Sequence, residues 1–333
     1  MQSPRFWYQP PQNQPLWAKA LTPLAMLYEF ATAKRVQKPA KVNVTPPVIC
    51  VGNINAGGTG KTPTTIALVQ FFQDHNMKAF VVSRGYGGAE QGPIEVAPNS
   101  HKARDVGDEP LLLAAFTRVF VAKNRALGAK LAQKAGADVI LLDDGHQNPD
   151  LHKDFSIVVV NAERGFGNGY VLPKGPLREP IDAGLKRADM VLSIGTDDAQ
   201  SHFAERYKSK LTLPHLQAEL NILQMGMDFK DLPVLAFAGI AHPEKFFETV
   251  RGLGARILHQ EALADHQELT PGLMRRLESD AARFGAQLIT TEKDAVRLPP
   301  AFRAQVLTIP VRLSFKNKSL LEAAFKRAGI LKT

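Results

Sequence analysis

The stretch that decides the fold is Val48-Ile-Cys-Val-Gly-Asn-Ile-Asn-Ala-Gly-Gly-Thr-Gly-Lys-Thr62. Its apolar start predicts a buried strand over 48–51, and the residues that follow the glycines predict a helix over 61–74. Between them, closely spaced glycines let backbone N–H groups converge on phosphate oxygens without hindrance from a Cβ atom. A strand, a glycine-rich turn and a helix in this order are typical of a phosphate-binding loop.

The predicted nucleotide-binding residues are Asn55, Ala56, Gly57, Gly58, Thr59, Gly60, Lys61 and Thr62. Lys61 would neutralise the β- and γ-phosphates, and the Thr62 hydroxyl would be a ligand of Mg²⁺. The loop is a variant, because Asn55 stands where the strict pattern has a glycine five residues before Gly60.

Short apolar runs alternate with helical stretches after the loop. Their apolar residues are continuous rather than alternating, which predicts a mostly parallel sheet with helices on both faces, as in P-loop NTPases. The predicted strands are 48–51, 79–83, 118–122, 138–142, 156–161 and 190–194, and the predicted helices are 61–74, 110–116 and 124–135.

A second set of elements begins near Leu232 and predicts a smaller C-terminal α/β domain. It comprises a strand that starts there, helices over 243–253 and 271–284, and strands over 287–291 and 305–311. The chain is thus divided into an N-terminal segment, 1–45, a P-loop domain, 46–229, and a C-terminal domain, 230–333, that closes the active-site cleft.

Paired carboxylates, Asp143 and Asp144, follow the predicted strand over 138–142. One of them could hold the Mg²⁺ shell while the other orients water or substrate. A plain turn after a strand is the alternative, since Asp-Gly is common in turns. The nearby phosphate loop favours the metal-site interpretation.

Two further pairs of adjacent ionisable residues have two interpretations each. Asp108 and Glu109 precede the helix over 110–116, where a carboxylate could cap the helix or accept a proton from an attacking hydroxyl. Spacing alone favours the cap. Asp265-His266 could be an acid–base pair, but spacing alone favours an ordinary surface dipeptide.

Three basic residues lie in loops rich in glycine and proline. Arg84 lies in the 83–88 loop, and Lys174 and Arg178 lie in the 167–180 loop. Such loops are suited to phosphate recognition by planar or point-charge donors.

The charge of the chain is concentrated at its N-terminus. Its 333 residues contain 41 Lys and Arg against 32 Asp and Glu, a net charge of +9, and the first 45 residues carry six basic residues and one acidic residue. More than half of the excess therefore lies in one seventh of the chain. The single cysteine, Cys50, excludes an internal disulfide and fits a reducing compartment.

The pattern of the N-terminal segment predicts an apolar helix from Leu16 to Ala33. Its apolar residues at helical spacing are Trp17, Leu21, Leu24, Tyr28 and Ala31. Lys19, Pro23 and Glu29 interrupt the stretch, so it does not predict a transmembrane span. The helix either packs on the core of the protein or lies in a membrane interface, with Lys34, Arg35, Lys38 and Lys41 on anionic headgroups.

The motifs together resemble the tetraacyldisaccharide 4′-kinase family, the lipid A kinases of Gram-negative envelopes. They occur in family order over almost the whole chain: VGNINAGGTGKTP (51–63), SRGYGG (83–88), DVGDEP (105–110), DVILLDDG-Q (138–147), FGNGYVLPKGPLREP (166–180), ADHQ (264–267) and TTEKDAVRLP (290–299).

The resemblance implies transfer of the γ-phosphoryl group of ATP to the 4′-hydroxyl of a tetraacyl glucosamine disaccharide 1-phosphate, at the cytoplasmic face of the inner membrane. It implies that Lys61 is catalytic, that Thr62, Asp143 and Asp144 serve the metal, and that Asp108 is the base, tuned by His266. Glu109, Arg84, Gln147, Lys174 and Arg178 are then expected at the substrate. The expected partners are the lipid and an anionic membrane surface, with no nucleic acid and no obligate protein.

One stretch departs from the family pattern. The family usually has Phe or Leu at position 146 and His at position 148, whereas this chain has His146 and Asn148. The resemblance therefore assigns no role to either residue.

Three other classes compete with the lipid kinase. A partition-type switch ATPase usually has a lysine directly before the two glycines, where this chain has Ala56. A nucleic-acid-binding NTPase would spread its basic residues over the catalytic domain, whereas most of the excess lies elsewhere. A soluble sugar kinase stays open if the N-terminal helix belongs only to the core.

Overall fold

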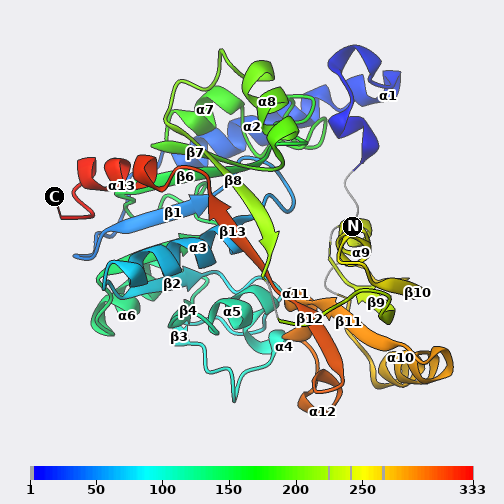
Figure 1. The fold of residues 1–333 in the computed structure, drawn as a ribbon. Coiled ribbons are helices and arrows are strands. Elements are labelled where there is room, and N and C mark those ends of the chain that lie inside the picture. Colours follow the sequence, from blue (N-terminus) through cyan, green and yellow to red (C-terminus); the bar gives the residue numbers. More distant parts are fainter. Residues whose placement is uncertain (1–3, 224–225, 241, 265–266, 333) are drawn as a thin grey trace.

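The computed structural model describes residues 4–223, 226–240, 242–264 and 267–332, and within these residues the chain forms two sheets (Figure 1). The larger sheet has the order β13-β8-β7-β6-β1-β5-β2-β4-β3, and its inner pairs are parallel. Its strands are β1 (Val48–Gly52), β2 (Ala79–Ser83), β3 (Ile94–Glu95), β4 (Val119–Val121), β5 (Val139–Asp143), β6 (Phe155–Asn161), β7 (Met190–Ile194), β8 (His215–Ile222) and β13 (Val311–Phe315).

Helices cover both faces of this sheet because its central strands are apolar throughout. Ile49 and Val51 of β1 share a core with α3 (Lys61–Asp74), whereas Val48 and Cys50 share a core with α6 (Arg125–Lys134). The other helices of this domain are α4 (Ala103–Val106), α5 (Asp108–Leu113), α7 (Ile181–Leu185), α8 (Asp197–Arg206) and α13 (Lys318–Arg327). The predicted fold class is confirmed.

The order of the central strands brings the two main motifs together. β1 and β5 are parallel neighbours, and Val51 is in register with Asp143. The phosphate loop follows β1, and the paired carboxylates are the last residue of β5 and the one after it, so both lie at the carboxyl edge of the sheet. This edge is where open α/β sheets bind their ligands.

The second sheet is smaller and parallel, with the order β10-β9-β11-β12. Its strands are β9 (Pro233–Ala238), β10 (Arg256–Ala262), β11 (Gln287–Thr291) and β12 (Val306–Ile309), and its helices are α9 (Pro243–Gly252), α10 (Pro271–Phe284), α11 (Glu292–Ala295) and α12 (Pro300–Arg303).

The C-terminal end of the chain departs from the predicted division. The range 230–333 was assigned to the second domain, but β13 pairs with β8 in the larger sheet. On α13, Phe325 packs against Phe72 and Phe155 of the P-loop domain. After β12 the chain therefore returns to the first domain, where its apolar helix face completes the core.

The N-terminal segment does not form the continuous helix that was predicted. It forms α1 (Leu16–Lys19) and α2 (Thr22–Val36), and Pro23 lies in the first turn of α2. Proline is favoured there because its missing N–H has no helical partner at that position. A short preceding stretch forms η1 (Arg5–Tyr8) and η2 (Pro11–Asn13).

The predicted apolar face of this segment is correct at only two of its five positions. Leu21 and Tyr28 are partly buried, but Trp17, Leu24 and Ala31 are exposed, and the buried positions are the small residues Ala18, Ala25 and Thr32. Small residues allow the helix to lie close to the domain, and they leave the large side chains outside. In the part of the chain that the structure describes, no helix is both long enough and apolar enough to span a bilayer.

Candidate active site

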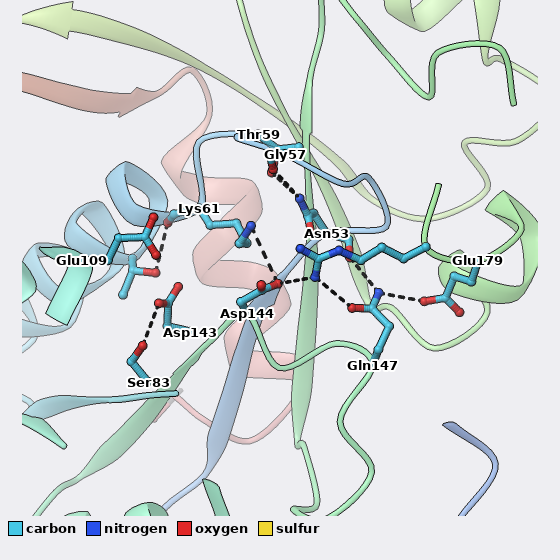
Figure 2. A network of polar contacts seen from close by, with 12 residues as sticks. Asn53, Gly57, Thr59, Lys61, Ser83, Glu109, Asp143, Asp144, Gln147 and Glu179 are labelled. Atoms are coloured by element: carbon cyan, nitrogen blue, oxygen red, sulfur yellow. Dashed lines mark hydrogen bonds and ion pairs between the residues drawn. The ribbon is translucent and has the colours of Figure 1, made fainter. Parts of the chain in front are cut away.

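Asn53 organises the phosphate loop from within. Its buried side-chain amide donates to the Gly57 carbonyl at 3.3 Å and to the Thr59 hydroxyl at 3.0 Å (Figure 2). Gly60 ends the loop with a φ of +94°, and a Cβ atom there would lie 2.5 Å from Ile194. The loop is therefore shaped by contacts of its own before any nucleotide binds.

The first half of the loop is held by a second segment, 176–178. The Ala56 N–H donates to the Pro176 carbonyl at 2.6 Å, and the Arg178 N–H donates to the Ile54 carbonyl at 2.7 Å. The Asn55 side chain donates to the Gly165 carbonyl at 3.0 Å. Asn55 and Ala56, which are predicted at the nucleotide, thus use these donors to fix the first half of the loop.

Asp144 lies at the centre of a charge cluster. Its Oδ1 is 2.9 Å from Arg178 Nη1. The same atom is 3.7 Å from Lys61 Nζ (Figure 2). Burial alone would raise the pKa of Asp144, but the charges of Lys61 and Arg178 outweigh it and lower the pKa. Asp144 is therefore an anion that orients both cations towards the loop.

Asp143 has a different environment although it is the adjacent residue. It accepts a hydrogen bond from the Ser83 hydroxyl at 3.2 Å on Oδ2, while its buried Oδ1 has no hydrogen-bond partner. Burial, and then the negative charges of Glu109 and Asp144, raises the pKa of Asp143 to about 7. A buried carboxylate oxygen without a partner is costly, so this atom is suited to a cation.

The backbone explains how the two carboxylates diverge. Asp144 has a φ of +50°, in the left-handed region that costs about 1 kcal/mol for a residue with a Cβ. Its carbonyl accepts a hydrogen bond from Arg125 Nη2 at 2.8 Å, which holds the turn. Arg125, like Asn53, is a site residue that the sequence analysis did not identify.

A polar chain extends from this cluster to a buried ion pair. Gln147 accepts from Arg178 at 3.3 Å and donates to the Asn53 carbonyl at 2.8 Å and to Glu179 Oε1 at 2.9 Å. Glu179 is 2% exposed and is bound by Arg187 Nη2 through both carboxylate oxygens, at 2.8 and 2.7 Å. Gln147 therefore links Arg178 to the buried ion pair of Glu179 and Arg187, which supports the site.

Removal of Arg187 is expected to destabilise this support. Arg187→Met would leave the Glu179 carboxylate buried without its cation, and such a loss costs about 3–5 kcal/mol of the free energy of unfolding. Arg118→Met is the matched control, because Arg118 and Glu95 form a similar pair on the surface, worth about 0–1 kcal/mol. Urea unfolding measures both, and equal losses would contradict the prediction.

Two glycine motifs pack against each other and place Asp108. A Cβ atom on Gly107 would lie 2.5 Å from the Tyr86 carbonyl, and one on Gly88 would lie 2.6 Å from the Asp105 carbonyl. Asp108 is the first residue of α5, its N-cap is Gly107, and no side chain caps the helix. The helix-cap interpretation of Asp108 is therefore wrong, since α5 begins two residues earlier than predicted.

The other predicted site residues vary in position. Glu109 Oε1 is 3.7 Å from Lys293 Nζ of the second domain, and Thr62 is half-buried at the start of α3. Arg84 is exposed, and the Lys174 ammonium lies 3.8 Å from the centre of the Tyr170 ring. His266 lies outside the described residues.

The two residues that depart from the family pattern have structural contacts. His146 is buried, and its Nε2 donates to the Gly184 carbonyl at 2.9 Å. Burial, and then the charge of Arg187, lowers the pKa of His146 to about 4, so the ring is neutral near pH 7. Asn148 forms a local turn with Asp150. Neither side chain contacts the Asp144 cluster.

Comparison with known proteins places this site in a family. The family model described as Tetraacyldisaccharide-1-P 4′-kinase matches residues 17–328. Tetraacyldisaccharide 4′-kinases of Dinoroseobacter shibae and of Jannaschia sp. are each 54% identical, over 97% of this chain and 96% and 98% of theirs.

A solved structure agrees in fold. The crystal structure described as the "apo" form of LpxK from Aquifex aeolicus in complex with ATP superposes with a TM-score of 0.77, at 24% identity, and covers 94% of this chain and 99% of that one. The family match, the close relatives and the phosphate loop opposite paired carboxylates lead to one conclusion: the chain belongs to the tetraacyldisaccharide 4′-kinase family and is an ATP-dependent kinase.

Proposed function

We propose that this chain transfers the γ-phosphoryl group of ATP to the 4′-hydroxyl of a tetraacyl glucosamine disaccharide 1-phosphate. The observation that carries the proposal is the cluster of Lys61, Asp144 and Arg178 beside the phosphate loop. Phosphoryl transfer requires mainly positioning and neutralisation of charge, and this cluster provides both.

Mg²⁺ fits the residues beside the loop. The Thr62 hydroxyl and the unpartnered Oδ1 of Asp143 would hold it, with Asp144 as a further acid on the metal side. A magnesium site in a protein usually relies on one or two carboxylates and on substrate phosphates, and two adjacent carboxylates are present here. Bound Mg²⁺ would neutralise the charge that develops on the phosphates.

Asp108 acts as the base on the 4′-hydroxyl. It is 6% exposed and lies at the junction of the two domains, where closure excludes water. The ε-ammonium of Lys61 and the guanidinium of Arg178 bind phosphate oxygens. His266 modulates Asp108 as a base. The lipid acceptor is bound with the help of Glu109, Arg84, Gln147 and Lys174.

The exposed apolar surface of the N-terminal segment binds the membrane that carries the lipid. We define this surface by its six large exposed side chains, Leu16, Trp17, Leu24, Met26, Leu27 and Phe30. Lys34, Arg35, Lys38 and Lys41 follow it in the chain and are exposed. Apolar side chains beside cations are the pattern of a peripheral helix on an anionic surface, here the cytoplasmic face of the inner membrane.

Substitution within this surface is expected to weaken membrane binding. The triple variant Met26→Ser, Leu27→Ser, Phe30→Ser should lose at least about tenfold in affinity for phosphatidylglycerol vesicles, because each large side chain that enters lipid contributes more than about 1 kcal/mol. Vesicle sedimentation measures this, and Leu127→Ser, exposed on α6, is the control. Unchanged binding of the triple variant would contradict the membrane role.

Substitution is a sharper test than deletion of residues 1–40. Trp7 Nε1 donates to the Pro173 carbonyl at 3.0 Å, and the Asn168 N–H donates to the Trp7 carbonyl at 2.7 Å. A deletion would therefore disturb the loop that carries Arg178 as well as the membrane surface.

The acceptor is tested directly with γ-labelled ATP, Mg²⁺ and detergent-dispersed tetraacyl disaccharide 1-phosphate. The label is expected on the lipid. A parallel reaction with a disaccharide that lacks the 4′-hydroxyl is the control. Label on that compound, or ATP turnover at the same rate without any lipid, would refute the proposed acceptor.

A further inference from the structure

One guanidinium of the second domain faces the Asp108 carboxylate of the first. Arg297 follows α11, and its Nε is 3.7 Å from Asp108 Oδ2. Both side chains are 8% exposed. Beside them, Lys293 and Glu109 form a second pair between the same two elements, α11 and α5. The contact between the domains is thus ionic and buried at the residue proposed as the base.

The rest of the guanidinium is fixed within its own domain. Nη2 contacts the fully buried carboxylate of Asp294 and the Gly239 carbonyl at 3.3 Å. Nη1 donates to the carbonyl of Gln267 at 3.0 Å, next in the chain after His266. Three partners in one domain hold the plane of this group, so its orientation does not depend on Asp108.

Gly239 is required for this arrangement. A Cβ atom there would lie 2.9 Å from Arg297 Nη2 and 3.1 Å from Asp294 Oδ1. The Gly239 N–H also donates to Asp294 Oδ1 at 3.1 Å. The turn after β9 therefore leaves space for the guanidinium and locks its counter-ion.

One donor of this fixed group is left over. Arg297 Nε is buried and has no hydrogen-bond partner. A buried donor without a partner is costly. The ion pair with Asp294 uses Nη2 and leaves Nε unpaired, so that pair alone does not explain why Nε faces Asp108. An approach of less than about 1 Å would bring Nε to the distance of a charge-assisted hydrogen bond.

We propose that Arg297 is a positioning residue for Asp108: as the second domain closes, its Nε–H binds one carboxylate oxygen and leaves the other directed at the acceptor hydroxyl. This rests on the proposed role of Asp108 as the base. Closure of the domains then aligns the base and excludes water in the same movement. The proton of the hydroxyl passes to the second oxygen of Asp108, and Arg297 itself exchanges no proton.

Arg297→Lys is the main test. A lysine keeps a positive charge beside Asp294, but it has one charged centre and cannot present a second fixed donor to Asp108. We expect kcat to fall about 10²-fold, the cost of a misplaced group, while KM for ATP and for lipid changes less than threefold. Arg303→Lys, exposed on α12, is the matched control and should keep wild-type kcat.

Two further variants keep the test decisive if Arg297→Lys is unstable. Gly239→Ala retains Arg297 but displaces its guanidinium, and should also lower kcat rather than raise KM. The pair Arg297→Gln with Asp294→Asn removes the guanidinium together with its counter-ion, so Asp294 is not left as a buried ion without a cation, and should lower kcat to the same degree.

The Asp108→Asn background separates this inference from the proposed function. There, Arg297→Lys should lower kcat by less than about threefold further, because the carboxylate that it positions is gone. Full additivity, a change in KM alone, or an unchanged kcat would overturn the role of Arg297. Wild-type kcat in Asp108→Asn alone would instead refute the base.

Discussion

Lys61→Ala is expected to reduce transfer of label from ATP to the lipid by at least about 10²–10³-fold. Loss of one preorganised donor to the charge of a transition state has a cost of this size. Lys61 Nζ lies 3.7 Å from Asp144 Oδ1 and the Lys61 side chain is 13% exposed, so water cannot readily take the place of the ammonium. The initial rate of labelled lipid formation, at saturating ATP and Mg²⁺, measures the effect.

The fold should survive this substitution. Asp144 retains its 2.9 Å contact with Arg178, so its carboxylate is not left without a cation. Lys134→Ala, at an exposed position on α6, is the control for loss of a lysine and should keep full activity. Retention of more than a tenth of the wild-type rate by a folded Lys61→Ala protein would exclude a catalytic role for Lys61.

Asp108→Asn should lower kcat by about 10²–10⁴-fold, the usual contribution of a general base. The amide has nearly the same shape as the carboxylate but cannot accept a proton from the sugar hydroxyl. Nucleotide affinity should change less than threefold, because the contacts of the phosphate loop are made by other residues. Single-turnover kinetics and binding of a fluorescent ATP analogue measure the two quantities separately.

Asp198→Asn provides the comparison for this variant. Asp198 is exposed in the first turn of α8, so loss of its charge should leave kcat unchanged. If Asp108→Asn bound nucleotide normally and kept kcat within about threefold of wild type, Asp108 would not be the base, and another acceptor of the proton would be required.

Much of the fold could be predicted from local pattern. β1, β5 and β7 lie where continuous apolar runs predicted them, because strands buried on both faces carry no polar interruption. β3, β8, β10 and β13 were missed. Polar and apolar residues alternate along β8, which is a strand signal that could have identified it. β13 follows β12 after a single proline, and the predicted strand over 305–311 ends at the first residue of β13.

The N-terminal segment shows a different limit. Helical spacing predicted an apolar face through Trp17 and Leu24, but the domain buries Ala18 and Ala25 instead. A helix that is apolar all round has no preferred side in its sequence. Which side of the helix is buried depends on the surface of the domain against which the helix packs.

The site divides in the same way. The glycines, Lys61 and the paired carboxylates were identified from the sequence because strand, turn and helix each constrain residue types nearby in the chain. Three other contacts of the site join residues that lie 8 to 189 positions apart in the chain. They are the contacts of Arg178 with Asp144, of Arg187 with Glu179 and of Arg297 with Asp108.

The sequence by itself predicted a P-loop nucleotide-binding domain, since a phosphate loop is a local structure whose chemistry depends on consecutive residues, and the order of its motifs indicated the kinase family by resemblance. Only the tertiary structure decided that the pKa of Asp143 is raised while that of Asp144 is lowered, because burial and neighbouring charges come from other strands and loops. The tertiary structure also decided that the second domain brings a guanidinium to Asp108. Electrostatic interactions depend on distances in space, and the separation of two residues along the chain does not give these distances.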